Sequence, residues 1–454
     1  MTLARKLRSR LGDLWWYSAI IFVACRSGDL IQAFIGLWLV PKFVPQEELG
    51  AALPLLQAGS VFGLPLSILV VPFSRWLTLY AARGERGKIK RLLSIAFAGT
   101  AAAFGIAAIA ARFILPLFFE RLSVAAGSLG LLIVCAGLVG PFSSVFGSAL
   151  QGLKRYGAIA AIAAASAPLR LAVMLVAMPF RALSGYVLGQ ISAPALNIVC
   201  SLAALRRDIG RDIHATPLGR DDVRAMFRYA VPFAAYMAAG TLLGAWQSLL
   251  FRQRLPEVES AAFYIISRFG EISTYFAMAM GAVLFPMAVE AAARGAGAAR
   301  LLARSLAGAL ATGLVATLCL WAFGGPLLGL VPLWRPYAPY AGLMAAFSLR
   351  MTLCAANGAF CSFETASGHF SFLRYWLPLT AVETGALVAF TGYGAFRGIL
   401  PDASVDWMRG LGAARLSFFI RWLLALTTLQ SLAIAAHLAI RHFRHHTPAG
   451  TAHP

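Results

Sequence analysis

The side chains of this sequence best suited to binding chemistry are charged residues placed inside long apolar runs. Two pairs of opposite charge have i,i+3 spacing, Arg26 with Asp29 and Arg268 with Glu271. Residues at that spacing share one face of a helix, so each pair can form an internal ion pair. The pairs either face a binding site or neutralise themselves while holding helices together, and the spacing fits both interpretations.

Two further arginines have no such partner. Arg170 and Arg350 lie in apolar runs with no acid within one helical turn, and a buried guanidinium of this kind needs an anion from elsewhere. Arg75 lies nearer the end of its run, and Glu383 is an isolated acid. Because guanidinium groups bind phosphate oxygens bidentately, the arginines indicate a cationic chamber for an anionic cargo, most simply a phosphate or pyrophosphate group. Glu383 would carry a proton or pair with an arginine after the cargo leaves.

The predicted site therefore consists of charged residues. Its substrate-binding residues, expected to line a cationic lumen, are Arg26, Arg75, Arg170, Arg268 and Arg350, and its coupling or ion-pair acids are Asp29, Glu271 and Glu383. Polar uncharged residues in the same runs are expected mainly to hydrogen-bond between helices. They are Gln57, Gln190, Asn197, Gln247 and Asn357.

Patterns typical of catalysis and metal binding do not occur in the sequence. The six cysteines lie within apolar runs, as small buried hydrophobes do. There is no HExxH, G-x-S-x-G or GxxxxGK[ST] segment. We therefore predict no enzyme activity, no cofactor, no metal site and no direct ATP hydrolysis.

The composition indicates a membrane protein. Of the 454 residues, 60% are hydrophobic and 13% are charged, against about 25% charged residues in soluble domains. This apolar content supplies about a dozen membrane helices of ~20 residues each, and it excludes a soluble enzyme, a disordered chain and a collagen-like fibre. The net charge of +21 then predicts basic cytoplasmic loops and no binding to nucleic acid.

Twelve apolar spans follow one another, which predicts an all-α polytopic membrane protein. Their approximate bounds are 16–41, 50–80, 92–118, 124–152, 157–180, 183–205, 229–251, 260–289, 301–331, 339–366, 372–393 and 416–440. With the N-terminus inside, the inner segments contain 23 Lys and Arg and the outer segments nine, so both termini are expected to be cytoplasmic. Pro65, Pro72 and Pro286 are expected kink points of the long spans 50–80 and 260–289.

A mixed-charge segment near the middle of the chain divides the spans into two pseudo-symmetric six-helix bundles. The predicted organisation is an N-terminal bundle (1–205), a cytoplasmic linker (206–228), a C-terminal bundle (229–441) and a cytoplasmic tail (442–454). The segments VPQEELGAAL (44–53) and LPEVESAAFY (255–264) echo each other about half a chain apart. Six spans per repeat is an even number, so the halves would share one orientation.

Several segments resemble polysaccharide-export flippases of the multidrug/oligosaccharidyl-lipid/polysaccharide (MOP) exporter superfamily. PQEELGAALPLLQ after the first span is similar to their P-E-E-(F/Y)-G segment. The run ALQGLKRYGAIAAIAAASAPLRLAVMLV (149–176) resembles their spans four and five, including an arginine in span five, here Arg170. FRYAVPFAAYMAAG (227–240) resembles their span seven, and AAFYIISRFGEI with VLFPMAVE resembles span eight. One departure is GAWQSLLFRQ, which lacks the aspartate that many of these flippases carry late in span seven.

This resemblance implies two V-shaped bundles around a cationic lumen and movement of an undecaprenyl-pyrophosphate-linked oligosaccharide across the bacterial inner membrane by alternating access. It also implies a polyprenyl-pyrophosphate glycolipid as substrate, surrounding membrane lipids, and polymerase or glycosyltransferase partners for surface or exopolysaccharide synthesis. The main alternative is a cation-coupled exporter of small molecules or drugs from the same superfamily. A third hypothesis is a membrane subunit of a polymer synthase complex.

Overall fold

A computed structural model describes residues 27–122, 127–153, 155–206, 214–275, 284–285, 287–289, 299–390 and 415–446. Within these ranges every regular element is a helix, in agreement with the predicted all-α class. Arg26, which was expected to pair with Asp29, lies outside the described residues.

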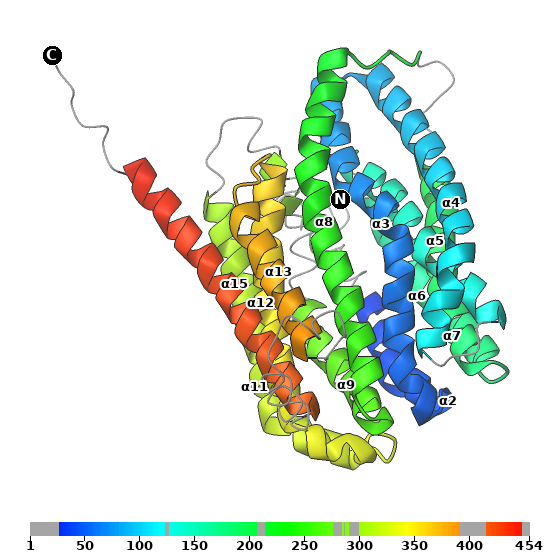
Figure 1. Cartoon of the computed structure of the whole chain (residues 1–454). Coiled ribbons are helices and arrows are strands. Elements are labelled where there is room, and N and C mark those ends of the chain that lie inside the picture. Colours follow the sequence, from blue (N-terminus) through cyan, green and yellow to red (C-terminus); the bar gives the residue numbers. More distant parts are fainter. Residues whose placement is uncertain are drawn as a thin grey trace, which may run out of the picture.

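The helices form two lobes that follow the order of the chain (Figure 1). The N-lobe contains the helical residues 27–34, a π-helical turn η1 (Ile35–Leu39), α2 (Val40–Phe43), α3 (Gln46–Arg83), α4 (Arg86–Leu122), α5 (Gly127–Gly152), α6 (Tyr156–Ala177) and α7 (Ala182–Leu205). The C-lobe contains α8 (Arg220–Arg254), α9 (Glu257–Glu271), η2 (Ile272–Thr274), α11 (Ala299–Leu330), η3 (Arg335–Tyr340), α12 (Gly342–Ala366), α13 (Leu373–Phe390) and α15 (Arg415–His446). The long helix α8 lies between the lobes and contacts both α3 and α13.

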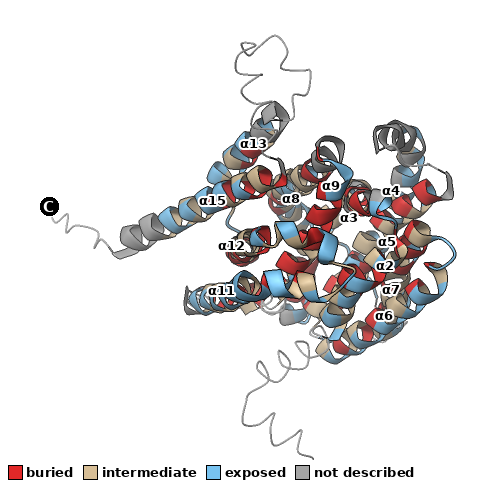
Figure 2. Ribbon diagram, turned by 90° about the horizontal axis from the view of Figure 1, so that it is seen from below, coloured by how far each residue is buried: buried red, intermediate tan, exposed pale blue. Residues whose placement is uncertain are grey.

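Eight helices in the described part of the chain are long and apolar enough to cross a membrane. Large apolar side chains on them point outward: Trp321 is 76% exposed and Ile106 is 69% exposed. Buried residues concentrate between the helices, whereas exposed residues lie on their outer faces (Figure 2). Because a bilayer solvates apolar side chains and leaves no backbone group a water partner, this arrangement is that of a multi-pass membrane protein.

The two segments that echo each other in the sequence have the same backbone conformation at one end of the molecule. Pro45 precedes α3 with φ −56° and ψ 150°, and Pro256 precedes α9 with φ −53° and ψ 153°. We call this the Pro45 end, which lies at the bottom of Figure 1. The two helices cross where Gly50 meets Ser260, whose hydroxyl donates to the Gly50 carbonyl at 3.4 Å. A Cβ on Gly50 would lie 2.4 Å from that hydroxyl oxygen, so only glycine permits this approach.

The opposite end carries the arginines and lysines of the α3–α4 turn and of the first turns of α8, and we call it the basic end. There α3 ends at Gly84, which has φ 72° and so favours glycine. The helix α8 begins at Arg220, inside the segment that we expected to be a linker (206–228). Two acids in the first turn, Asp221 and Asp222, favour this earlier start by complementing the helix dipole. Asp222 also forms a 3.1 Å ion pair with Lys88 on α4.

Prolines do not interrupt the long helix α3. Pro54, Pro65 and Pro72 lie inside one continuous helical segment from Gln46 to Arg83. The eighth predicted span, by contrast, changes helix type at Ile272–Thr274, where α9 ends in a 3-10 turn. Pro286, the expected kink point of that span, lies outside the described residues.

Candidate functional site

A cavity of about 430 Å³ lies midway along the helices, where the N-lobe meets α9. Its apolar wall includes small residues of α5, among them Ala136, Gly137 and Gly140. Gly137 also allows the backbone of α5 to contact the backbone of α3 at Gly59. The cavity also has a polar wall, drawn from residues 27–34, α3, α6, α7 and α9. Its members are Gln32, Gln57, Ser60, Arg170, Tyr186, Gln190, Arg268 and Glu271.

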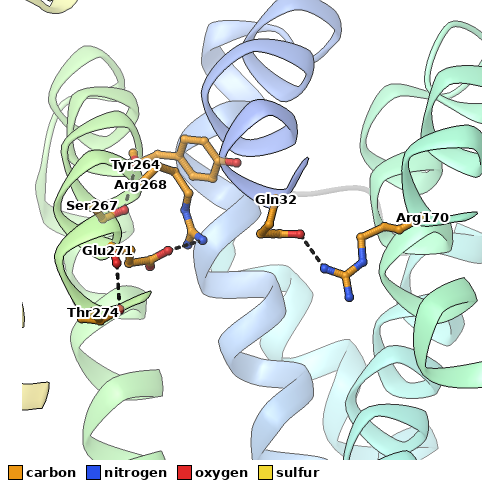
Figure 3. A network of polar contacts seen from close by, with 7 residues as sticks. All are labelled: Gln32, Arg170, Tyr264, Ser267, Arg268, Glu271 and Thr274. Carbon is orange, nitrogen blue, oxygen red and sulfur yellow. Dashed lines mark hydrogen bonds and ion pairs between the residues drawn. The ribbon is translucent and has the colours of Figure 1, made fainter. Parts of the chain in front are cut away.

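Arg170 projects into this cavity from α6. Its Nη1 donates a 2.5 Å hydrogen bond to Gln32 Oε1, and its Nε is buried without a hydrogen-bond partner. In the described part of the chain no acid lies within ion-pair distance of this guanidinium. Figure 3 shows Arg170 reaching toward Gln32 from one side of the space while Arg268 enters it from the other. Arg170 thus brings a positive charge to the polar wall of the cavity, without an acid as partner among the described residues.

Arg268 is neutralised within its own helix. Its Nη1 lies 2.7 Å from Glu271 Oε2, which is the i,i+3 ion pair expected from the sequence. The guanidinium also lies 5.3 Å from the centre of the Tyr264 ring, a distance suited to a cation–π contact. Gly36 leaves room for the stem of Arg268, because a Cβ there would lie 2.9 Å from its Cδ. The described residues that line the cavity therefore include two guanidinium groups and one carboxylate, and their net positive charge resides on Arg170.

Arg350 belongs to a separate network inside the C-lobe. Its Nη2 donates to Gln247 Oε1 at 3.5 Å, and Gln247 Nε2 donates to Glu383 Oε1 at 2.6 Å. Gln430 Nε2 reaches the other oxygen of Glu383 at 3.5 Å. A side chain from α8 thus connects the arginine of α12 to the acid of α13. Arg350 has no acid within one helical turn of the sequence, but the fold connects it to Glu383 through Gln247.

Arg75 lies away from the central cavity, near the basic end. Its Nη1 donates hydrogen bonds to the carbonyls of Thr365, at 3.2 Å, and of Ala366, the last residues of α12. The Tyr229 hydroxyl of α8 also donates to the Thr365 carbonyl at 2.9 Å, and the Tyr229 ring lies 4.9 Å from the Arg75 guanidinium. The last carbonyls of a helix have no partner within it and carry its negative dipole end. Arg75 satisfies them from the other lobe.

The remaining predicted acid is Asp29. It is half-buried in the helical residues 27–34, three residues before Gln32. Gln32 and Tyr186 line the cavity although we did not predict them as site residues. The sequence contained a signal for Gln32, because its i,i+3 spacing from Asp29 places both side chains on the same face of one helix. In the described ranges no group of three or more His, Cys, Asp or Glu side chains is placed to hold a metal ion.

No protein-family model matches the chain, and no curated protein matches it. Solved structures do. An inward-facing multidrug-resistance MATE transporter of the MOP superfamily has a TM-score of 0.63 at 12% identity, over 95% of this chain and 100% of its own. A mutant of the Vibrio cholerae MATE transporter VcmN has a TM-score of 0.64 at 15% identity, over 96% and 98% of the two chains.

A third similar structure comes from Pyrococcus furiosus, with a TM-score of 0.63 at 14% identity over 95% of this chain and 97% of the other. It is described as a MOP-superfamily transporter in which a reversed polarity of the binding pocket suggests a different function. All three likenesses extend over nearly the whole length of both chains. The chain therefore has the two-lobed helical fold of the MATE transporters in the MOP superfamily.

Proposed function

We propose that this protein is a transporter that moves a small organic solute with an anionic group across the membrane by alternating access. The proposal depends on one observation: the half-buried guanidinium of Arg170 faces the cavity where the N-lobe meets α9, and it has no acid as partner in the described part of the chain. The cavity volume of about 430 Å³ is that of a site for a small organic molecule. The MATE-like fold supports the exporter of small molecules over the lipid-linked oligosaccharide flippase.

The sign of charge in the cavity limits the cargo. A cation would approach Arg170 without compensation, because Glu271, the one carboxylate among the described lining residues, is already paired with Arg268. An anionic group in the cavity gains charge-assisted hydrogen bonds from the guanidinium of Arg170, whose Nη1 donates to Gln32. The glutamines around it supply neutral donors and acceptors for the remainder of the solute.

Alternating access requires the lobes to separate at each end in turn. At the Pro45 end Trp334 Nε1 donates to the Leu37 carbonyl at 2.6 Å, so η3 of the C-lobe is joined to η1 of the N-lobe. At the basic end Arg75 joins α3 to α12. In our proposal these two interlobe contacts break alternately while the cavity stays between them.

A second candidate function is the flippase for an undecaprenyl-pyrophosphate-linked oligosaccharide in the bacterial inner membrane, with both termini cytoplasmic. The unpaired guanidinium of Arg170 also fits a pyrophosphate, and the segments around spans two, five, seven and eight resemble such flippases. In this case polymerase or glycosyltransferase proteins would be partners. A deletion strain would then accumulate lipid-linked oligosaccharides, which the small-solute exporter would not cause.

The test of the main proposal is transport by the full chain in proteoliposomes. Uptake of a benzenesulfonate is compared with uptake of a phenyltrimethylammonium of similar size. We expect uptake of the anion alone, its loss in Arg170→Gln, and its retention in Arg181→Gln, a control on an exposed arginine between α6 and α7. Uptake of the cation by both variants and the wild-type protein would contradict the proposal.

A further inference from the structure

A second cavity of about 490 Å³ adjoins the first and shares Gly140, Pro141 and Pro194 with it. Along α3, Gln57 and Ser60 line the first cavity, and Ser67 and Val70, further along the helix, line the second. Along α5, Ala136 lines the first cavity, Gly140 lines both, and Ser144 lines the second. The second cavity therefore continues the first toward the basic end.

Among the described residues, none that lines this second cavity carries a charge. Val70, Val71 and Met237 contribute apolar surface from α3 and α8. Each serine hydroxyl among the described lining residues donates within its own helix: Ser67 to the Gly63 carbonyl, and both Ser143 and Ser144 to the Gly140 carbonyl. An occupant therefore meets a mainly apolar lining here, directly beside the cationic polar wall of the first cavity.

We propose that the second cavity binds the apolar body of the same solute whose anionic group binds Arg170, so that the cargo is an amphiphilic organic anion. This inference rests on the proposed function and adds to it a second subsite and an orientation. The anionic group lies beside Arg170 and Gln32, and the apolar body points toward the basic end between Val71 and Ser144. Burial of apolar surface in the second cavity adds affinity that a short polar anion cannot obtain.

Two probes that share one anionic group and differ in apolar size test this subsite. They are benzenesulfonate, which fits the first cavity alone, and 1-pyrenesulfonate, which has a larger apolar body. Equilibrium binding to the full chain in nanodiscs is measured, and uptake by empty nanodiscs is subtracted. We expect wild-type protein to bind pyrenesulfonate about tenfold or more tighter than benzenesulfonate, a difference of about 1.4 kcal/mol.

Filling the second cavity with a larger side chain should lower the affinity for pyrenesulfonate and leave the affinity for benzenesulfonate unchanged. Ser144→Phe introduces a large side chain at an exposed position of α5 that lines the second cavity. Ser67→Phe introduces one into the same cavity from α3. Each should weaken pyrenesulfonate about tenfold and leave benzenesulfonate within about twofold. The matched control is Ser94→Phe, because Ser94 is also exposed and donates to the carbonyl four residues before it, Lys90, but lines neither cavity. The control should leave the affinity for both probes unchanged.

The possible results separate this inference from the proposed function. If wild-type protein binds both sulfonates equally, or both filling variants retain full affinity for pyrenesulfonate, the apolar subsite is refuted while the anion site at Arg170 stands. If neither sulfonate binds, or Arg170→Gln binds both as wild type does, the proposed function is refuted as well. Melting temperatures of the variants show which of them fold, and the two filling positions provide independent tests.

Discussion

Arg75 and Ala366 are 291 residues apart in the chain, and the guanidinium of the first donates a hydrogen bond to the carbonyl of the second. This contact joins α3 of the N-lobe to the end of α12 in the C-lobe. Gly368, with φ 79°, turns the chain away directly after α12 and lies against the Arg75 guanidinium. The basic end of the structure is thus closed by a side chain that completes a helix end of the opposite lobe.

Replacing Arg75 should favour opening at the basic end. Arg75→Gln shortens the side chain and removes its charge, and a hydrogen bond to a charged group contributes about 1.5–3 kcal/mol. We expect a single cysteine at Ser144 to react about tenfold faster with a membrane-impermeant maleimide added from the basic end. Arg83→Gln, an exposed position on the same helix, should leave the rate unchanged. An unchanged rate in Arg75→Gln would argue against a role for this contact in closure.

Replacing Trp334 should favour opening at the Pro45 end. Trp334→Phe removes the N–H that donates to the Leu37 carbonyl at 2.6 Å but keeps an aromatic ring near Phe269, which packs edge-on at 5.2 Å. A cysteine at Ser60 should become more reactive to reagent added from the Pro45 end. Trp321→Phe is the control, because Trp321 is largely exposed on the outer surface. Equal labelling of all three proteins would refute this prediction.

Gly50 should not tolerate a side chain. A Cβ at this position would lie 2.8 Å from the Ser260 Cβ and 3.3 Å from its backbone carbon, so the lobes must separate. We expect Gly50→Ala to lower the free energy of unfolding by about 1–3 kcal/mol, measured by thermal unfolding in detergent. Gly99→Ala on α4 meets no atom within 4 Å and should be neutral or slightly stabilising. Equal melting temperatures for the two variants would mean that the helix crossing is looser than the structure indicates.

Glu383 should matter for turnover and not for binding. Its carboxylate accepts hydrogen bonds from Gln247 and Gln430 in the C-lobe and lies outside the central cavity. If it carries the coupling proton, Glu383→Gln will bind benzenesulfonate like the wild-type protein but will no longer respond to an imposed proton gradient in proteoliposomes. Glu257→Gln, at an exposed position at the start of α9, is the control. A full response to the gradient in Glu383→Gln would remove Glu383 from the coupling mechanism.

The sequence predicted those features that depend on local spacing. Apolar runs identified the membrane helices, and the i,i+3 pair of Arg268 and Glu271 formed as expected. The sequence has no acid within one turn of Arg170, and in the fold the hydrogen-bond acceptor of its Nη1 is the neutral Gln32. These features depend on helix periodicity alone, which a single sequence contains.

Features that depend on packing between distant segments could not be predicted. Arg75 satisfies carbonyls 290 and 291 residues away, and nothing near it in the sequence indicates that helix end. Arg350 reaches Glu383 through Gln247, a residue of a third helix. The four predicted arginines that lie in the described part of the chain therefore do not share one chamber. Arg170 and Arg268 line the cavity, whereas Arg75 and Arg350 lie in separate networks.

The central claim is that Arg170 binds an anionic group in the cavity, and equilibrium binding to the full chain in nanodiscs tests it most directly. Benzenesulfonate and phenyltrimethylammonium are titrated against wild type, Arg170→Lys and Arg170→Gln. We expect the wild-type protein to bind the sulfonate alone, with binding weakened but retained in Arg170→Lys and lost in Arg170→Gln. Equal sulfonate affinity in all three proteins, or tighter binding of the ammonium by wild type, would contradict it.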